Sequence, residues 1–288
     1  MARIIGDDRD DTFTGTAGKD SVEGRGGDGR LFTTRGVPML LAVALALAVG
    51  ATVPAGAQGI TERVSVGPGG VQGDRDSSDP ALSADGRLVA FLSSATNLVP
   101  GDTNGRPDVF VRDRQTGITE RVSVGPDGVQ GDESSGAPAL SADGRFVAFD
   151  SGAINLVPGD TNGRSDVFVR DRQAGTTRRV SIGPGGVQGD GRSFDPAISA
   201  DGRLVAFYSG ATNLVPGDTN ELFDVFVHDR RTGTTRRVSV GLGGVQGNWH
   251  SFDPALSADG RVIAFDSSAS NLVPGDTNFA SDVFVHTR

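Results

Sequence analysis

From residue 60 to its end, the chain repeats one pattern with a period of 58 residues. The octapeptide that begins at Ile60 returns, with a few substitutions, at Ile118, Thr176 and Thr234. The motif Ser-Ala-Asp-Gly-Arg and the string Asn-Leu-Val-Pro-Gly-Asp-Thr-Asn also occur four times in the same phase. A strict period of this length is typical of repeat proteins, in which each unit buries its apolar surface against its neighbours. The fold must therefore consist of equivalent units, which we place at residues 60–117, 118–175, 176–233 and 234–288.

Each unit has the pattern of four β-strands. Pro80–Ser83 is a short strand, and an Asp-Gly turn leads from it into Leu88–Ser93. Asp108–Asp113 is the third strand and Ile118–Val124 the fourth. Consecutive apolar residues in the second and third strands indicate sheets that are covered on both faces, as stacked blades are. The sequence therefore predicts an all-β fold, a β-propeller of four blades with four strands each.

Residues 83–91, Ser-Ala-Asp-Gly-Arg-Leu-Val-Ala-Phe, resemble a known family. They are similar to the Ser-Pro-Asp-Gly-Lys-x-Ile-Ala-Phe core of the PD40 (WD40-like) repeats of TolB-type propellers. The chain departs from that family in having Ala84 where proline is usual, and in a repeat longer than the roughly 40–45 residues of a standard blade. The resemblance implies a propeller whose relatives bind proteins in the periplasm or carry a peptidase domain. No peptidase domain is recognisable in this sequence.

The two ends of the repeat array predict how it closes. The array begins on a fourth strand, Ile60–Val66, and stops after a third strand that starts at Asp282. We expect residues 60–66 to complete the last blade and close the ring, which removes exposed strand edges and makes the protein a monomer. The alternative is an open partial propeller that closes by self-association.

Residues 30–57 are typical of an export signal. No charged residue occurs between Arg35 and Glu62, and residues 55–57 have the Ala-x-Ala form of a signal-peptidase site. We therefore expect a secreted, periplasmic or cell-surface protein, with a propeller at residues 58–288 and cleavage before Gln58. The alternative is an uncleaved membrane anchor, because residues 36–57 are long enough to span a bilayer. That segment would then be the protein's one contact with a membrane.

Residues 1–29 contain three segments rich in glycine and aspartate, which start nine residues apart at Gly6, Gly15 and Gly24. They resemble the nonapeptide calcium repeat of RTX (haemolysin-type) proteins. A few degenerate copies are too few to bury a core, so we expect this segment to be disordered. A true start near Val37 or Met39 is the alternative, because the segment precedes the export signal.

Composition and motifs exclude several classes of function. The formal net charge of −9 argues against nucleic acid and anionic membranes as partners, and the absence of cysteine excludes thiol nucleophiles and zinc-thiolate sites. No Gly-x-Ser-x-Gly, His-Glu-x-x-His or phosphate-loop motif occurs. His228 and His286 replace Arg112 and Arg170 of the other repeats, as strand-surface substitutions would. We expect no enzymatic activity, and the alternative is a polysaccharide lyase or hydrolase with carboxylates at the ring mouth.

The long loops of each repeat, Gly67–Asp79 and Ser94–Pro107 in the first, are expected on one face of the propeller. Binding residues concentrate on loops that a rigid scaffold holds. The third and fourth repeats carry large apolar or aromatic side chains there, which predicts a surface that recognises a protein or glycan of the cell envelope. The alternative is that these side chains pack between neighbouring blades. The candidate binding residues are Phe194, Leu222, Phe223, Trp249, His250, Phe252 and Phe279.

The motif Gly-Asp-Thr-Asn-x-x-x-Asp places three oxygen ligands in a short loop of each repeat. Such a set can wrap a hard cation such as calcium, with a backbone carbonyl and water completing the shell. The alternative is an Asx turn, followed by an aspartate that is bonded to backbone amides. The candidate ligands are Asp102, Asn104, Asp108, Asp160, Asn162, Asp166, Asp218, Asn220, Asp224, Asp276, Asn278 and Asp282. The sequence as a whole thus predicts an exported, non-catalytic binding or scaffold protein for which calcium is a possible stabilising ion.

Overall fold

The structure is a computed structural model that describes residues 3–5, 21–23, 31–32, 38–39 and 59–288. The chain divides into two compact units, Met1–Ile60 and Thr61–Arg288. In the first unit, β1 (Arg3–Ile5) pairs in parallel with β2 (Ser21–Glu23), and β3 (Leu31–Phe32) pairs antiparallel with β4 (Pro38–Met39). Most of the RTX-like segment and of the export segment lies outside the described residues. Within the described part of the chain, no helix is long and apolar enough to cross a membrane.

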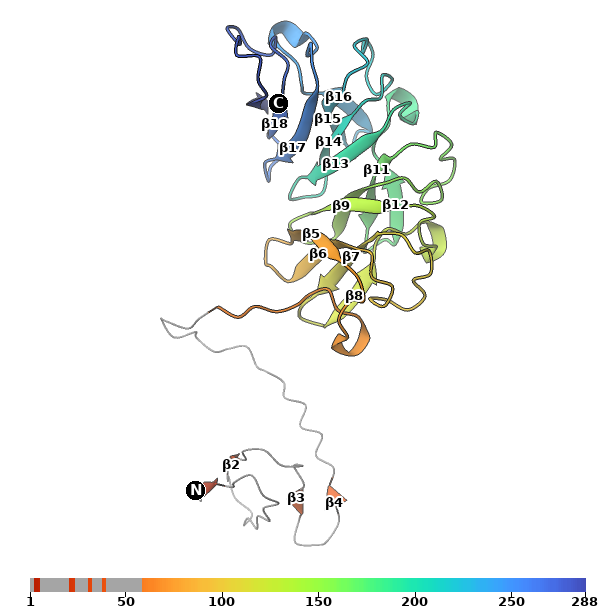
Figure 1. The fold of residues 1–288 in the computed structure, drawn as a ribbon, viewed down its shortest axis with the longest axis vertical. Coiled ribbons are helices and arrows are strands. Elements are labelled where there is room, and N and C mark those ends of the chain that lie inside the picture. Colours follow the sequence, from red (N-terminus) through yellow and green to blue (C-terminus); the bar gives the residue numbers. More distant parts are fainter. Residues whose placement is uncertain (1–2, 6–20, 24–30, 33–37, 40–58) are drawn as a thin grey trace. The chain divides into compact units, whose positions relative to one another are not determined.

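The second unit folds into four antiparallel sheets, one for each repeat, which we call blades 1 to 4 (Figure 1). The strands of blade 1 are β5 (Ser77–Leu82), β6 (Leu88–Ser93), β7 (Asp108–Asp113) and β8 (Ile118–Arg121). The strands of blade 2 are β9 (Ser135–Leu140), β10 (Phe146–Ser151), β11 (Asp166–Asp171) and β12 (Thr176–Arg179). The strands of blade 3 are β13 (Ser193–Ile198), β14 (Leu204–Ser209), β15 (Asp224–Asp229) and β16 (Thr234–Arg237). Blade 4 has three strands, β17 (Ser251–Leu256), β18 (Val262–Ser267) and β19 (Asp282–Thr287).

Strands pair in chain order within each blade, and a short 3-10 turn precedes each first strand. These turns are η1 (Pro68–Gly70), η2 (Pro126–Gly128), η3 (Pro184–Gly186) and η4 (Leu242–Gly244). The prediction of an all-β protein made of four propeller-like blades is confirmed.

Two strand boundaries differ from the prediction. The first strand starts earlier, at Ser77, because Asp79 adopts a φ of 51° and forms a bulge that lets pairing with β6 continue on both sides. The fourth strand ends earlier, at Arg121. There the N–H of Val109 donates to the Ser123 hydroxyl at 3.1 Å, so a side chain takes the place of the next ladder bond.

The apolar core lies between adjacent blades. Val109 and Val111 of blade 1 pack against Phe149 and Phe168 of blade 2. Equivalent clusters join blade 2 to blade 3 and blade 3 to blade 4. Each inner blade is therefore covered on both faces, which explains why its second and third strands are apolar on consecutive positions.

The two ends of the array are not joined. Ring closure by residues 60–66 is not shown, because none of the described pairs joins this segment to β19. The side chains of Val283 and Val285 on β19 are 78% and 65% exposed, whereas the equivalent Val225 of blade 3 is fully buried. Blade 4 therefore presents to solvent a face that the other blades bury.

Candidate functional site

The two long loops of each repeat are bonded into one unit. In the first repeat, the Asp74 carboxylate accepts the N–H of Thr96 at 2.8 Å and its hydroxyl at 2.7 Å. The Asn97 amide donates to the carbonyl of Gln72 at 2.9 Å. A Cβ on Gly67 would overlap the carbonyl oxygen of Asn97, so the loops approach each other closely only because this residue is glycine. These bonds hold the two loops of the repeat side by side.

The loops of successive repeats are also connected. Gln130 of the second repeat donates to the Thr103 hydroxyl of the first at 2.8 Å, and Arg106 of the first forms an ion pair with Glu133 of the second at 3.0 Å. The Asn104 amide donates to the carbonyl of Gly131 at 2.9 Å. The long loops therefore form a continuous belt along the array.

The candidate calcium ligands of blades 1 to 3 each surround an arginine side chain. One guanidinium nitrogen of Arg121 lies 3.1 Å from Asp102 and 3.4 Å from Asp108. The Asn104 amide donates to the same Asp108 oxygen at 2.9 Å, and the Ser123 hydroxyl donates to the other oxygen at 2.5 Å. Arg179 and Arg237 occupy the same place in the next two blades, with both carboxylates at 3.0 to 3.1 Å. In these three loops, an arginine of the protein itself supplies the positive charge between the carboxylates.

Burial dominates the electrostatics of these loops. It raises the pKa of Asp102, Asp160 and Asp218, although the neighbouring arginine opposes the rise. Both carboxylate oxygens of Asp160 and the Nε of Arg179 have no hydrogen-bond partner of good geometry. An ion pair that is this dry offsets only part of its own desolvation cost.

The fourth loop contains the same ligand set without the arginine. Asn278 donates to Asp282 at 2.7 Å, as in the other blades, and Asp276 follows the same backbone path. No arginine of the described residues forms an ion pair with Asp276 or Asp282. Within the described residues, no three acidic or histidine side chains are grouped as metal ligands would be.

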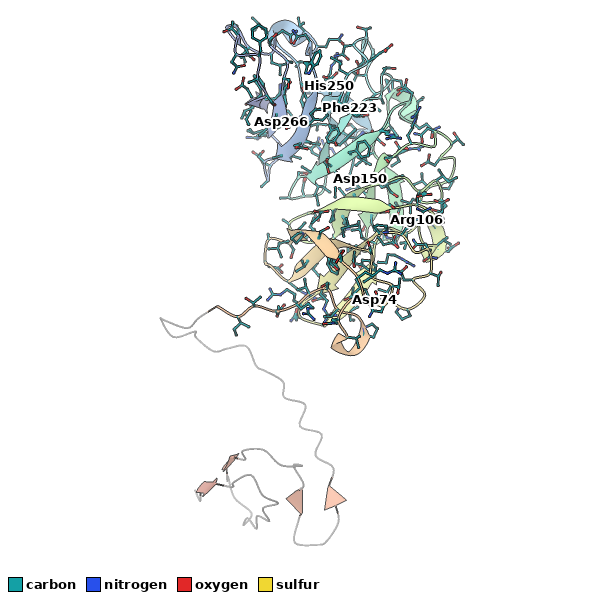
Figure 2. The ribbon with its side chains drawn as sticks, in the orientation of Figure 1. Asp74, Arg106, Asp150, Phe223, His250 and Asp266 are labelled. Carbon is teal, nitrogen blue, oxygen red and sulfur yellow. The ribbon has the colours of Figure 1, made fainter. Side chains whose placement is uncertain are left out.

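Most of the candidate binding residues form one aromatic cluster between blades 3 and 4. Phe194 and Phe223 of blade 3 contact Tyr208, and Tyr208 contacts Phe252 of blade 4 with ring centroids 5.2 Å apart. His250 stacks on Phe252 and accepts the N–H of Phe223 at 3.0 Å on its Nδ1. Figure 2 places Phe223 and His250 side by side at this junction.

The candidate binding residues differ in how much of their side chain is exposed. Five rings are half-buried at the junction of blades 3 and 4, those of Phe194, Tyr208, Phe223, His250 and Phe252. Leu222 is half-buried as well. Trp249 contacts His250 edge-on and keeps 55% of its surface exposed. Phe279 is 96% exposed and makes no ring contact among the described residues. Packing thus fixes the base of the cluster and leaves Trp249 as its solvent-facing side chain.

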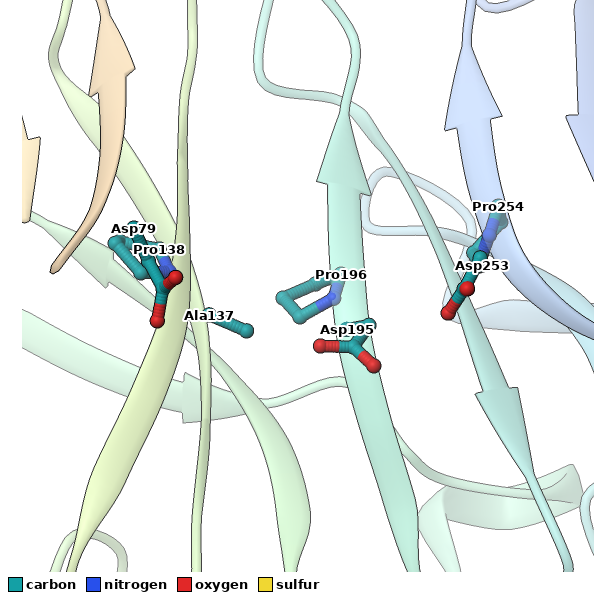
Figure 3. Close-up of a pocket in the computed structure, with 7 residues that line it drawn as sticks. All are labelled: Asp79, Ala137, Pro138, Asp195, Pro196, Asp253 and Pro254. Atoms are coloured by element: carbon teal, nitrogen blue, oxygen red, sulfur yellow. The ribbon is translucent and has the colours of Figure 1, made fainter. Parts of the chain in front are cut away.

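A second feature lies where the first strands of all four blades meet. An open depression of about 330 Å³ is lined by their bulges, as Figure 3 shows. Its lining residues are Asp79, Ala137, Pro138, Asp195, Pro196, Asp253 and Pro254. Beside it, Asp150 accepts the N–H of Asp195 at 3.2 Å, and burial raises the pKa of Asp150 to about 6. This is the carboxylate-rich mouth of the array.

The proteins found to be similar to this chain are all solved structures. No family model matches the chain, and no curated protein does. Among solved structures, TolB from Acinetobacter baumannii is 20% identical, with a TM-score of 0.44 over 74% of this chain and 41% of that one. A putative TolB from Agrobacterium tumefaciens is 17% identical, with a TM-score of 0.45 over 74% of this chain and 61% of that one. The β-propeller domain of the Trilobed protease from Pyrococcus furiosus is 13% identical, with a TM-score of 0.42 over 74% and 55%.

The chain is similar in structure to TolB- and tricorn-type β-propeller domains. It spans about 41% to 61% of the length of the TolB proteins it matches. At identities of 13% to 20%, the similarity is one of fold alone.

Three kinds of residue at these sites were missing from the sequence prediction. The arginines inside the loops could have been found, because Arg121, Arg179 and Arg237 recur with the period of the aspartates. Tyr208, the only tyrosine, occupies a strand position that holds Asp150 in blade 2, and no motif marks it. The bulge residues at the depression are marked only by the proline that follows each of them.

Proposed function

We propose that the chain is a non-catalytic binding or scaffold propeller that works outside the cytoplasm and recognises a protein or glycan of the cell envelope. Its recognition surface is the long-loop face at the junction of blades 3 and 4. The observation that carries the proposal is Trp249, an exposed indole on top of a packed set of aromatic rings. Tryptophan that is held rigidly supplies large contact area at low entropic cost, which is the property of binding hot spots.

Two features of the sequence support the remaining parts of the proposal. The apolar segment before Gln58 supports export, and residues 83–91 support assignment of the blades to the PD40 type of repeat. The rigid belt of loops supports a scaffold, because a surface that is already ordered loses little entropy when it binds.

The test compares Trp249→Ala with wild type in capture of purified envelope polysaccharide and of envelope proteins on the immobilised full-length chain. We expect capture by the variant to fall about ten-fold or more, as loss of a hot-spot tryptophan does. Leu242→Ala is the matched control, because Leu242 is exposed, apolar and outside the cluster. Equal capture by wild type and Trp249→Ala would reject this surface. Capture of the polysaccharide would identify a glycan as the partner, and capture of the envelope proteins would identify a protein.

A glycan-active enzyme is the second candidate function. The specific observation in its favour is the Asp150 carboxyl, whose pKa of about 6 is suited to a general acid, beside Asp195 at the axial depression. This candidate predicts turnover of a polysaccharide by the full-length protein, abolished by Asp150→Asn. Absence of turnover on a panel of neutral and acidic polysaccharides would reject it.

A further inference from the structure

The three junctions between blades are built from the same contacts. The N–H of Ala84 donates to the carbonyl of Ala142 at 2.9 Å, and the same bond joins Ala142 to Ala200 and Ala200 to Ala258. Apolar clusters of equivalent residues fill each junction. The same interface is therefore used three times. In each case the face of one blade that points toward the next repeat, here called its leading face, packs against the opposite or trailing face of the next blade.

Blade 4 has the leading half of a fourth such interface. Its residues Val262, Val283 and Val285 are exposed, whereas the same positions in blade 3 are buried. Strand β19 has a free edge, while the equivalent β15 pairs with β16 along four residues. This edge and face together form a surface that matches the rest of the fold but has no partner in the described chain.

The charge of blade 4 indicates which strand would fit there. Asp276 and Asp282 lack the arginine that lies between the carboxylates in blades 1 to 3. By the 58-residue period, the strand that carries the matching arginine begins with Thr61-Glu62-Arg63. Arg63 is exposed and donates to Gln72, as Arg121 does to Gln130.

Residues 61–66 already contact the trailing side of blade 1, as residues 119–124 contact blade 2 one repeat later. Glu62 pairs with Arg114, as Glu120 pairs with Arg172 one repeat later. The Thr119 hydroxyl donates to the carbonyl of Val66 at 2.7 Å. The trailing half of the fourth interface is therefore preformed at the opposite end of the array from blade 4 (Figure 1).

The two halves do not meet within one described chain. No bond joins Ala258 to Ala84, although Ala84, Ala142 and Ala200 all make the equivalent contact. Closure within the chain would require all three junctions to change their angle. A second copy needs no such change, because its blade 1 can follow blade 4 through a fourth junction of the same geometry.

We propose that blade 4 docks onto the N-terminal strand and blade 1 of a second copy of this chain. The incoming residues 61–66 form the fourth strand of blade 4, and Arg63 of that copy pairs with Asp276 and Asp282. The interface is head-to-tail, so two copies that dock reciprocally close a ring, and further copies lengthen the array when it does not close. The pairing of β7 with β8 sets the register: Arg63 opposite Phe284, Glu62 opposite Val285 and Thr61 opposite His286.

A disulfide test uses the absence of cysteine from the chain. Thr61→Cys and His286→Cys are introduced together, and the purified full-length protein is oxidised and run without reductant. We expect covalent dimers or larger species, because cross-strand partners lie within the distance that a disulfide spans. A disulfide within a monomer, or no disulfide, overturns the proposal. Thr61→Cys with Val283→Cys is the off-register control, and we expect little cross-linking from it.

A second measurement does not depend on oxidation. Light scattering of the full-length protein over a range of concentrations should show self-association of wild type. Arg63→Glu should raise the concentration for half-assembly by at least about ten-fold, because a third carboxylate would then face those of Asp276 and Asp282 and repel them. Arg231→Glu, an exposed charge reversal away from the interface, should leave it unchanged. A wild-type protein that is monomeric at every concentration, or assembly that is unaffected by Arg63→Glu, overturns the proposal.

Discussion

At the scale of single residues, the environment decides what an aspartate does in this protein. Asp171 at the end of β11 accepts two bonds from Arg145, and the pKa of its carboxyl falls to about 2. Asp150 on the neighbouring strand lies in a dry position without a cation, and burial raises its pKa to about 6. The two residues have the same chemistry and opposite effects on stability as pH changes.

Replacement of Asp150 by asparagine should stabilise the protein at neutral pH. A carboxyl whose folded pKa is raised favours folding only while it is protonated, so wild type loses stability as pH rises from about 4 to about 6. The loss is up to about 3 kcal/mol, which Asp150→Asn should avoid, because the amide oxygen still accepts the Asp195 N–H. Urea unfolding at pH 4 and pH 7 measures the free energy of unfolding of the wild type and of the variant. Equal stability of variant and wild type at pH 7 would contradict the prediction, and Asp266→Asn, at the same position in blade 4, is the control.

Replacement of Gly125 by alanine should destabilise the second repeat. A Cβ at this position would overlap the carbonyl oxygen of Asn155 and approach the Cα of Leu156 to 3.2 Å. Overpacking against backbone costs about 1–3 kcal/mol, because the loop must move as a whole. Gly136→Ala is the control, since its Cβ would meet only ordinary contacts at 3.8 to 4.0 Å. Gly125→Ala should have a lower melting temperature than Gly136→Ala. A melting temperature of Gly125→Ala equal to that of the wild type would refute the close approach.

At the scale of elements, the aspartate loops of blades 1 to 3 are each completed by the last strand of the same blade. Asp108 begins β7, and the arginine that pairs with it, Arg121, ends β8. The loop is therefore organised by strand pairing, and it has a guanidinium in its centre only where a fourth strand is present. Blade 4 is the exception, and calcium binding remains a prediction for its loop.

Calcium should raise the melting temperature of the full-length protein through the fourth loop alone. In a copy that is not assembled, Asp276, Asn278 and Asp282 offer oxygen ligands without a competing arginine, whereas a cation in blades 1 to 3 would have to displace one. The increase should disappear in Asp276→Asn, because a carboxylate is lost from the ligand set. Asp218→Asn in blade 3 should keep it. A melting temperature that is the same in calcium and in chelator would end the calcium hypothesis, and magnesium serves as the control for ionic strength.

At the scale of the whole molecule, stability is a sum over blades and the junctions between them. Each blade contacts its neighbours in sequence, as in other repeat proteins, so local changes spread no further than one junction. An arginine-aspartate pair also closes each of the first three blades: Arg87 with Asp113, Arg145 with Asp171, and Arg203 with Asp229. Blade 4 has Thr287 at the aspartate position and lacks the pair.

These three pairs should produce a loss of stability in acid. Arginine bonds lower the pKa of Asp113, Asp171 and Asp229, to about 2 for the last two. A carboxyl with a lowered folded pKa stabilises the fold above about pH 4, and this contribution is lost as pH falls towards 2. Urea unfolding at pH 4, 3 and 2 should show the loss, and the triple Asp→Asn variant should lose less over the same range. A wild-type profile as flat as that of the triple variant would contradict the assignment.

The sequence by itself determined the features that depend on local pattern. The 58-residue period, the Asp-Gly hairpins and the apolar runs of residues such as Val109 and Phe149 specify four blades, because strand pairing within a blade joins segments close in sequence. The predicted cover on both faces is found in the inner blades, whereas one face of blade 4 is exposed. The sequence also showed that large aromatic side chains are concentrated in the long loops of the third and fourth repeats. Residues 1–58 contribute expectations that lie mainly outside the described structure.

Only the tertiary structure decided how distant residues combine. It placed Arg121 between Asp102 and Asp108, brought Tyr208 under the aromatic cluster, and gathered the four first-strand bulges around one depression. It also left one edge of β19 free at one end of the array and residues 61–66 at the other. These outcomes depend on the angle at which blades stack, which is a sum of many weak packing contacts between repeats and has no signature in any single motif.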